Sequence, residues 1–198
     1  MESHLYSIGI GVIALIALGR ALVVLYILFF RSLSYRKRAV ATPAAWTDFV
    51  TYLEPPLLPA LTLFLWITHE NPAQPATLEL TRVFVGVAVA LGALALLLWS
   101  VRVFPTVAVG HYVLPDQEVI TNGPYAYVRH PLYLAAILIW VSVAIGFASL
   151  VAGLITVGYV IPAYMIYSRS EEKMMLEHLG TPYRVYRDTT GGFMPRLH

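Results

Sequence analysis

Long apolar blocks separated by short polar segments run along most of the chain. The apolar blocks cover residues 5–30, 49–68, 81–104 and 132–167. A helix of about 20 apolar residues is enough to cross the hydrocarbon core of a bilayer. The fourth block is long enough for two crossings, and the mostly small residues 146–149 near its centre favour a tight turn. The pattern therefore predicts five membrane spans, with a C-terminal helical hairpin formed by the fourth and fifth: residues 5–30, 49–68, 81–104, 132–146 and 149–167.

The composition agrees with this fold class. Hydrophobic residues make up 59% of the 198 residues and charged residues only 12%, which is far from the average of soluble proteins. We therefore expect an all-α integral membrane protein with a single domain over residues 1–198. The first block ends at Arg31 and is longer than the core of a signal peptide, so we expect a retained span. The net charge of +2 does not indicate nucleic-acid binding, and the absence of cysteine excludes disulfides and thiolate sites.

The basic residues predict the orientation, because Lys and Arg in short loops mark the cytoplasmic side. Residues 69–79 contain neither, whereas basic residues follow the first and the last span. They are Arg31, Arg36, Lys37 and Arg38 in the first group and Arg169, Lys173, Arg184, Arg187 and Arg196 in the second. Five spans, with the N-terminus outside and the C-terminus in the cytoplasm, place both groups on the cytoplasmic side.

The second block contains Glu54 and several prolines, in the sequence TYLEPPLLPALTLFLW. Prolines interrupt helical hydrogen bonding, so we expect a kink or a break near Pro55. An acidic residue within a span is a candidate functional residue, and the alternative is a side chain that reaches the cytoplasmic interface. We hypothesise that the kink leaves a lateral entrance from the bilayer, which makes Glu54 a candidate for substrate binding.

Two polar segments, residues 105–131 and 168–198, hold most of the residues that can do chemistry. The predicted topology puts both on the cytoplasmic side, where they can meet. In the second segment apolar side chains recur at helical spacing and charged side chains occupy the other faces, which predicts an amphipathic helix ended by Gly180. The apolar stripe consists of Met174, Met175, Leu176 and Leu179. It fits a helix lying on the bilayer surface, but it gives no reason for Glu171-Glu172 at the membrane exit.

Arg129-His130-Pro131 immediately precedes the fourth span. Proline is favourable in a first helical turn, whereas a cation at this positive helix end is unfavourable. We therefore expect an anionic group from the ligand or the protein beside Arg129 and His130; the alternative is contact with a lipid phosphate. Tyrosines surround the pair in sequence: Tyr112, Tyr125, Tyr127, Tyr133, Tyr183 and Tyr186. Tyrosine is enriched at membrane interfaces in any case, so the tyrosines alone are weak evidence. Combined with Glu171-Glu172 and Arg129-His130, they predict a pocket for a zwitterionic ligand with an additional positive centre.

Other cofactors fit the sequence poorly. There is no P-loop, no dinucleotide fingerprint after a strand, and no His-x-x-x-His pair. His111 and His130 are lone histidines, so we predict no metal site. A reductase that uses a nicotinamide cofactor is disfavoured for the same reasons.

The C-terminal half resembles the isoprenylcysteine carboxyl methyltransferase and phospholipid methyltransferase family of integral membrane enzymes. The matching residues, in order, are Gly123-Pro124-Tyr125, Arg129-His130-Pro131, Tyr133, Glu171-Glu172, Gly180, Tyr183, Tyr186, Phe193 and Pro195. One departure is Gln117, which stands where many members that methylate prenylcysteine have a histidine.

The resemblance implies S-adenosylmethionine as methyl donor, in a cytoplasmic pocket between the two polar segments. The implied cofactor-binding residues are Gln117, Val119, Ile120, Gly123, Tyr125, His130, Tyr133, Glu171, Glu172 and Tyr183. The catalytic candidates are Arg129, His130 and Glu172, and the candidates for substrate binding are Arg129, Glu54 and Tyr186.

The methyl acceptor is expected to be lipophilic and to enter from the bilayer. A carboxylate acceptor, as in an isoprenylcysteine, is already nucleophilic and is oriented by a cation such as Arg129; this is the favoured prediction. The alternatives are the amine of phosphatidylethanolamine, which must lose a proton to His130 or a glutamate, and a small thiol. A membrane scaffold or a small transporter is the alternative that is not an enzyme.

Overall fold

The structure is a computed structural model that describes residues 2–26, 53–70, 75–105, 113 and 117–196. Within these ranges every regular element is helical, and an isolated β-bridge joins Val128 to Gly191. The α-helices are α1 (Glu2–Tyr26), α4 (Glu54–Thr68), α5 (Thr77–Val103), α6 (Pro131–Gly146), α7 (Leu150–Ile155), α8 (Ile161–Leu179) and α9 (Thr181–Thr189). Two short helices complete them: the 3₁₀ helix η3 (Gly123–Ala126) and the π-helical turn η4 (Thr156–Val160).

Three helices of the described chain are long and apolar enough to cross a membrane: Glu2–Tyr26, Thr77–Val103 and the continuous run Leu150–Leu179. Large apolar side chains cover their outer surfaces; Leu22, Leu98 and Leu154 are each more than half exposed. Such a surface suits contact with lipid, so the fold is that of an integral membrane protein. The predicted spans 49–68 and 132–146 correspond to α4 and α6, which have 15 and 16 residues; residues 49–52, like residues 27–30 of the first span, lie outside the described chain.

Two predicted helix boundaries differ from the structure. The last apolar helix does not end at residue 167 but continues as α8 to Leu179, where Gly180 with φ 60° ends it. The charged part of α8 thus extends the same helix that carries the apolar part. The predicted interruption near Pro55 is a helix start, because α4 begins at Glu54 and places its first two prolines in the first turn.

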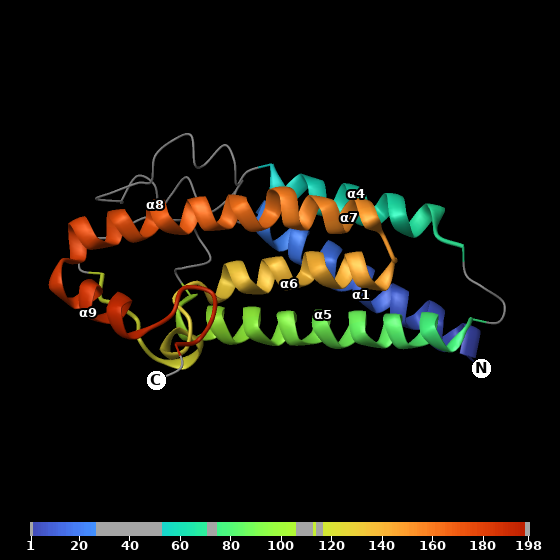
Figure 1. Ribbon diagram of the computed structural model, residues 1–198, viewed down its shortest axis with the longest axis horizontal. Helices are drawn as coiled ribbons and strands as arrows, with labels where there is room; N and C mark the ends of the chain where they lie inside the picture. Colours follow the sequence, from blue (N-terminus) through green and yellow to red (C-terminus); the bar gives the residue numbers. More distant parts are fainter. Residues whose placement is uncertain (1, 27–52, 71–74, 106–112, 114–116, 197–198) are drawn as a thin grey trace.

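Glycines bring α1, α5 and α6 close together. A Cβ atom on Gly146 of α6 would lie 2.3 Å from Ile13 of α1, and one on Gly86 of α5 would lie 3.1 Å from the Gly146 backbone. Such small residues let membrane helices pack backbone to backbone. They hold α6 in the middle of the bundle, beside α5 (Figure 1).

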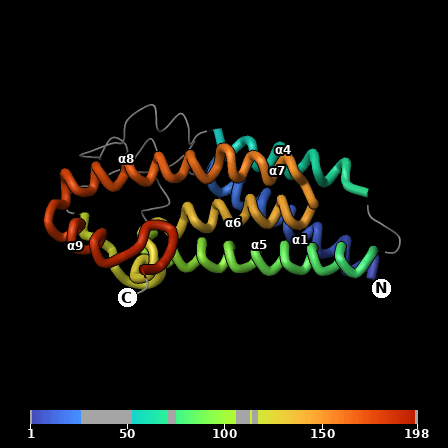
Figure 2. Tube along the Cα trace, in the orientation of Figure 1, coloured from blue at the N-terminus to red at the C-terminus, as the bar shows by residue number. Residues whose placement is uncertain are grey.

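The chain reverses direction after α6. Ala148 in the turn has a positive φ of 49°, and the Ser149 hydroxyl caps α7 by accepting from the Ala152 amide at 3.2 Å. The helix then passes through η4 into α8, which extends beyond the end of α6 before α9 folds back (Figure 2). As a result α9, residues 117–130 and the C-terminal segment gather at one end of the molecule, opposite the N-terminus (Figure 1).

Candidate functional site

Backbone pairing with the C-terminal segment fixes Arg129 and His130. The Arg129 amide donates to the Gly191 carbonyl at 2.8 Å, and the His130 amide donates to the Gly192 carbonyl at 3.1 Å. A Cβ atom on Gly191 would collide with the Met194 carbonyl oxygen at 1.8 Å. Residue 191 must therefore be glycine for this pairing, which the sequence analysis did not anticipate.

The Arg129 guanidinium pairs with Glu172 of α8. Its Nε and Nη2 lie 2.9 and 2.8 Å from the same carboxylate oxygen, Oε1. Its Nη1 donates to the carbonyl of Arg187 at 3.0 Å and to that of Thr190. The anionic partner expected beside this cation is thus supplied by the protein, and all three guanidinium nitrogens are engaged.

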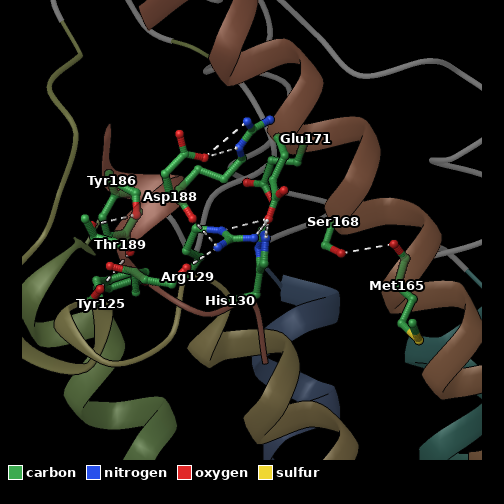
Figure 3. A network of polar contacts seen from close by, with 12 residues as sticks. Tyr125, Arg129, His130, Met165, Ser168, Glu171, Tyr186, Asp188 and Thr189 are labelled. Atoms are coloured by element: carbon green, nitrogen blue, oxygen red, sulfur yellow. Dashed lines mark hydrogen bonds and ion pairs between the residues drawn. The ribbon is translucent and has the colours of Figure 1, made fainter. Parts of the chain in front are cut away.

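His130 is held between the two glutamates. The ring is 6% exposed; its Nε2 lies 2.8 Å from Glu172 Oε1 and its Nδ1 lies 3.5 Å from Glu171 Oε2. Burial lowers the pKa of His130, but the hydrogen bonds and charges of Glu171 and Glu172 outweigh burial and raise it above its ordinary value. Figure 3 shows Arg129 and His130 side by side, facing Glu171 on α8.

Glu171 binds a different set of side chains from its neighbour. The Tyr133 hydroxyl donates to Glu171 Oε2 at 2.9 Å, and the Tyr133 ring stacks on His130 with centroids 5.4 Å apart. Consecutive residues of a helix point about 100° apart. The Glu-Glu pair can therefore serve two functions, with Glu172 fixing the cations and Glu171 reaching the pocket beside them.

A pocket lies next to this network, at the end of α5, α6 and α8. Its walls are mainly aromatic and apolar, with polar groups from the loop before α6 and from α8. The lining residues are Phe104, Gln117, Glu118, Val119, Ile120, Tyr125, Arg129, His130, Glu171, Met175, Leu179, Tyr183 and Tyr186.

The Tyr125 hydroxyl is buried and has no hydrogen-bond partner among the described residues. The Tyr186 hydroxyl donates to the Tyr125 carbonyl at 2.7 Å, which fixes the backbone there (Figure 3). Burial raises the pKa of Tyr125, Tyr183 and Tyr186, so all three hydroxyls remain protonated. Because Tyr125 lines the pocket, its hydroxyl is a candidate hydrogen-bond donor to a ligand.

Most of the predicted site residues line this pocket, and four do not. Glu172 lies behind it, against Arg129 and His130, and Tyr133 reaches it through Glu171. Gly123 is a turn residue with φ 59°, where a Cβ atom would lie 2.6 Å from Val103 of α5. The fourth, Glu54, lies elsewhere. His111 and Tyr112 are outside the described residues, and the part of the chain that is described contains no cluster of three or more potential metal ligands.

Glu54 is part of a second polar network, within the helices. Its Oε1 accepts from Arg20 Nη1 at 2.5 Å and Trp140 Nε1 at 2.6 Å, and its Oε2 accepts from Arg20 Nη2 and the Tyr164 hydroxyl, both at 3.0 Å. With 2% of its surface exposed, Glu54 does not reach interfacial water. The interpretation that it extends to the membrane surface is therefore wrong, because an arginine on α1 neutralises it inside the bundle.

Sequence reasoning missed several contributors. Arg20 interrupts the first apolar block, and its charge was the available signal for a partner of Glu54. The pocket walls Met175 and Leu179 were interpreted as part of a stripe on a bilayer-surface helix. No sequence signal distinguished Phe104 or Glu118.

The sequence model of the phospholipid methyltransferase family matches residues 81–182, about half of the chain. The chain belongs to this family. The matched region of this membrane methyltransferase extends from α5 into the start of α9 and contains Arg129, His130, Glu171 and Glu172. The resemblance stated from the motifs is thereby confirmed at the level of the family. No curated protein matches the chain significantly.

Proposed function

We propose that this membrane methyltransferase uses S-adenosylmethionine to methylate the amine of a lipid headgroup. We further propose that five spans carry the pocket on the cytoplasmic side, with the N-terminus outside. The observation that carries the proposal is the buried Tyr125 hydroxyl, which has no hydrogen-bond partner among the described residues and belongs to an aromatic pocket also lined by Glu171.

The pocket residues fit the groups of S-adenosylmethionine. Phe104, Tyr183 and Tyr186 offer rings for a flat heteroaromatic base and for a positively charged sulfur. Glu171 and Glu118 offer carboxylates to hydroxyl and ammonium groups, and Tyr125 offers a protonated hydroxyl. When bound, the cofactor supplies a methyl group on a sulfonium, which an acceptor takes by direct displacement.

The task of the protein is then to position the reactants and to exclude water. Glu172 fixes Arg129 and His130, and the Tyr133 hydroxyl fixes Glu171. The backbone pairing of Arg129 and His130 with Gly191 and Gly192 anchors this assembly to the C-terminal segment. Arg129, His130, Glu171 and Glu172 are thereby held in place before any ligand arrives.

The arrangement around Arg129 favours an amine acceptor. A carboxylate acceptor needs a cation to orient it, but every nitrogen of Arg129 already donates to Glu172 or to backbone carbonyls. A protonated amine instead needs a carboxylate that holds it and takes its proton, and Glu171 lines the pocket, where the Tyr133 hydroxyl fixes it. We therefore propose a headgroup such as that of phosphatidylethanolamine, whereas the carboxylate and thiol acceptors stay predictions.

Calorimetric titration of the detergent-purified protein with S-adenosylmethionine and S-adenosylhomocysteine tests the cofactor. We expect saturable binding that Glu172→Gln loses and that Glu177→Gln keeps. Glu177 is a matched control because it lies on the same helix, 58% exposed, and pairs only loosely with Lys173 at 3.9 Å. No binding by folded protein, in detergent and in lipid nanodiscs, overturns the proposal.

A methyl-transfer assay then compares acceptors. Phosphatidylethanolamine, a farnesylated cysteine and a small thiol are supplied in the same nanodiscs with a labelled methyl donor. We expect label in the phospholipid. Label in the farnesylated cysteine or the thiol, and none in the phospholipid, would overturn the choice of an amine.

A further inference from the structure

We propose that the Arg20–Glu54 network inside the bundle is a positioning device for the pocket. In this proposal it acts through the rings of Tyr164 and Tyr133 on His130 and Glu171. No described atom of the network lines the pocket, so its effect on the pocket is indirect.

The network is closed, which argues against a ligand site of its own. Both Glu54 oxygens accept two hydrogen bonds each, from side chains of α1, α6 and α8. The Arg20 and Glu54 side chains are 6% and 2% exposed, and Trp140 is fully buried. A charge pair in a bilayer is costly unless all of its hydrogen bonds are satisfied, as they are for this carboxylate.

Tyr164 links the network to the next ring. Its hydroxyl donates to Glu54 and accepts from Arg20 Nη2 at 3.0 Å, which fixes the ring in one orientation. The ring stacks on Tyr133 with centroids 5.1 Å apart and planes 23° apart. The orientation of Tyr133 therefore depends on how Tyr164 is held.

Tyr133 carries the effect into the site. Its ring also stacks on His130, with centroids 5.4 Å apart and planes 9° apart, and its hydroxyl donates to Glu171 at 2.9 Å. The stack of His130, Tyr133 and Tyr164 thus joins the pocket to an ion pair that shares no residue with it. Without the Glu54 carboxylate, Tyr164 loses its acceptor and Arg20 is left unneutralised, so both are expected to move.

The test follows the His130 ring by NMR of protein labelled with ¹³C at the histidine Cε1 position. The His130 signal is assigned by its loss in His130→Gln. The variants are Glu54→Gln, Tyr164→Leu, which removes the stack, and Tyr164→Phe, which keeps the ring and removes only the hydroxyl. Ser142→Ala is the control, because Ser142 is buried in α6 and, among the described residues, its hydroxyl bonds only to the Ile139 carbonyl.

We expect Glu54→Gln and Tyr164→Leu to shift the His130 resonance and its titration midpoint, Tyr164→Phe to shift them less, and Ser142→Ala to leave both unchanged. The charged and titratable groups around His130 are Arg129, Glu171, Glu172 and Tyr133, and all are retained in these variants. Affinity for S-adenosylhomocysteine should fall by at most about tenfold in Tyr164→Leu, the limit reached if the whole free energy of the lost aromatic stack acts on the pocket.

The proposal is overturned if Tyr164→Leu and Tyr164→Phe fold and have lower thermal midpoints than the parent, while their His130 resonance and titration midpoint are the same as in the parent. The network would then only hold the helices together. The affinity measurement rests on the proposed function, whereas the NMR measurement needs no ligand. If the parent binds no S-adenosylhomocysteine, the proposed function fails and the His130 signal still decides the positioning role.

Discussion

Two arginine–glutamate pairs lie in the described part of the chain, and they differ in what remains unsatisfied around them. Arg129 and Glu172 are 12% and 18% exposed and lie beside a pocket lined by Tyr125, whose hydroxyl has no partner among the described residues. Arg20 and Glu54 are 6% and 2% exposed, and the Glu54 carboxylate is fully hydrogen-bonded by side chains of three other helices. The comparison teaches that a charge within a membrane protein does not by itself mark a ligand site. A ligand site is indicated instead by neighbouring polar groups that still lack a hydrogen-bond partner.

The largest effect is expected from breaking the inner pair. Glu54→Leu leaves Arg20 buried without a counter-charge, which typically costs about 3–5 kcal/mol of stability. The double variant Arg20→Met with Glu54→Leu should recover most of this loss, because no charge is then stranded. Unfolding of the purified protein in detergent measures both, and a double variant as unstable as Glu54→Leu would contradict the pairing.

At the outer pair, losses are expected in both folding and binding. Glu172→Gln weakens charge-assisted hydrogen bonds to both Arg129 and His130, and such bonds contribute about 1.5–3 kcal/mol each to stability. Without them Arg129 and His130 are held less firmly at the pocket wall, so S-adenosylhomocysteine should bind about tenfold more weakly. Calorimetry measures the change in affinity. An equal loss of affinity in Glu177→Gln would show that the total charge of α8 matters and that the position of Glu172 does not.

The outer pair should also depend on pH. The pKa of His130 is raised in the folded protein, so the stability from its glutamate contacts is complete below its ordinary pKa and is lost as pH rises through the raised value. The thermal midpoint of the parent should therefore decrease from about pH 6 to about pH 9, and that of His130→Gln should decrease less. If the thermal midpoints of the parent and of His130→Gln change in parallel with pH, the histidine is not protonated between the glutamates.

Tyr125→Phe should separate binding from stability. The hydroxyl has no partner among the described residues, so removing it should leave the folded protein unchanged or slightly more stable. If it donates to a bound cofactor, affinity should fall by about 1 kcal/mol, roughly fivefold. Calorimetry and thermal unfolding of the same sample measure the two effects, and unchanged affinity would exclude this hydroxyl from the contact.

The smallest effect is expected at the solvated pair on α8. Lys173 and Glu177 lie 3.9 Å apart and are 80% and 58% exposed. Lys173→Gln should therefore change stability by less than about 1 kcal/mol and leave cofactor affinity unchanged. A larger effect on affinity would extend the functional surface of α8 beyond Glu171 and Glu172.

The sequence was most informative where few residues could satisfy a constraint. Apolar blocks predicted a helical membrane protein, and the motifs around Arg129, His130, Glu171 and Glu172 identified the family. The sequence also predicted an anionic group beside Arg129 and His130, from the ligand or the protein, because a cation at a helix N-terminus needs one. The structure shows that Glu172 is an anionic partner of both.

The inner network could not be predicted in the same way. Whether Arg20 meets Glu54 depends on the rotation of four helices about their axes, which apolar periodicity in a bilayer fixes poorly. The Gly191 pairing depends on backbone contacts of a segment without regular structure. Met175 and Leu179 were recognised as an apolar stripe, but a pattern alone does not tell a pocket wall from a lipid-facing surface.

Because of the π-helical turn Thr156–Val160, the function of the last membrane helix depends on the number of its residues as well as on their identity. Tyr164 of the inner network and Glu171 and Glu172 of the outer one all follow this turn on one continuous helix. A π-helical turn holds one residue more than an α-helical turn in the same place, so deleting one residue there, such as the exposed Gly158, should restore ordinary α-helix and leave both networks close to register. The same deletion just after the turn, at Ile161–Ala163, where the helix is already α-helical, would rotate both networks by about 100°. The effect of a one-residue deletion in this helix is therefore expected to depend on whether it falls within the turn or after it.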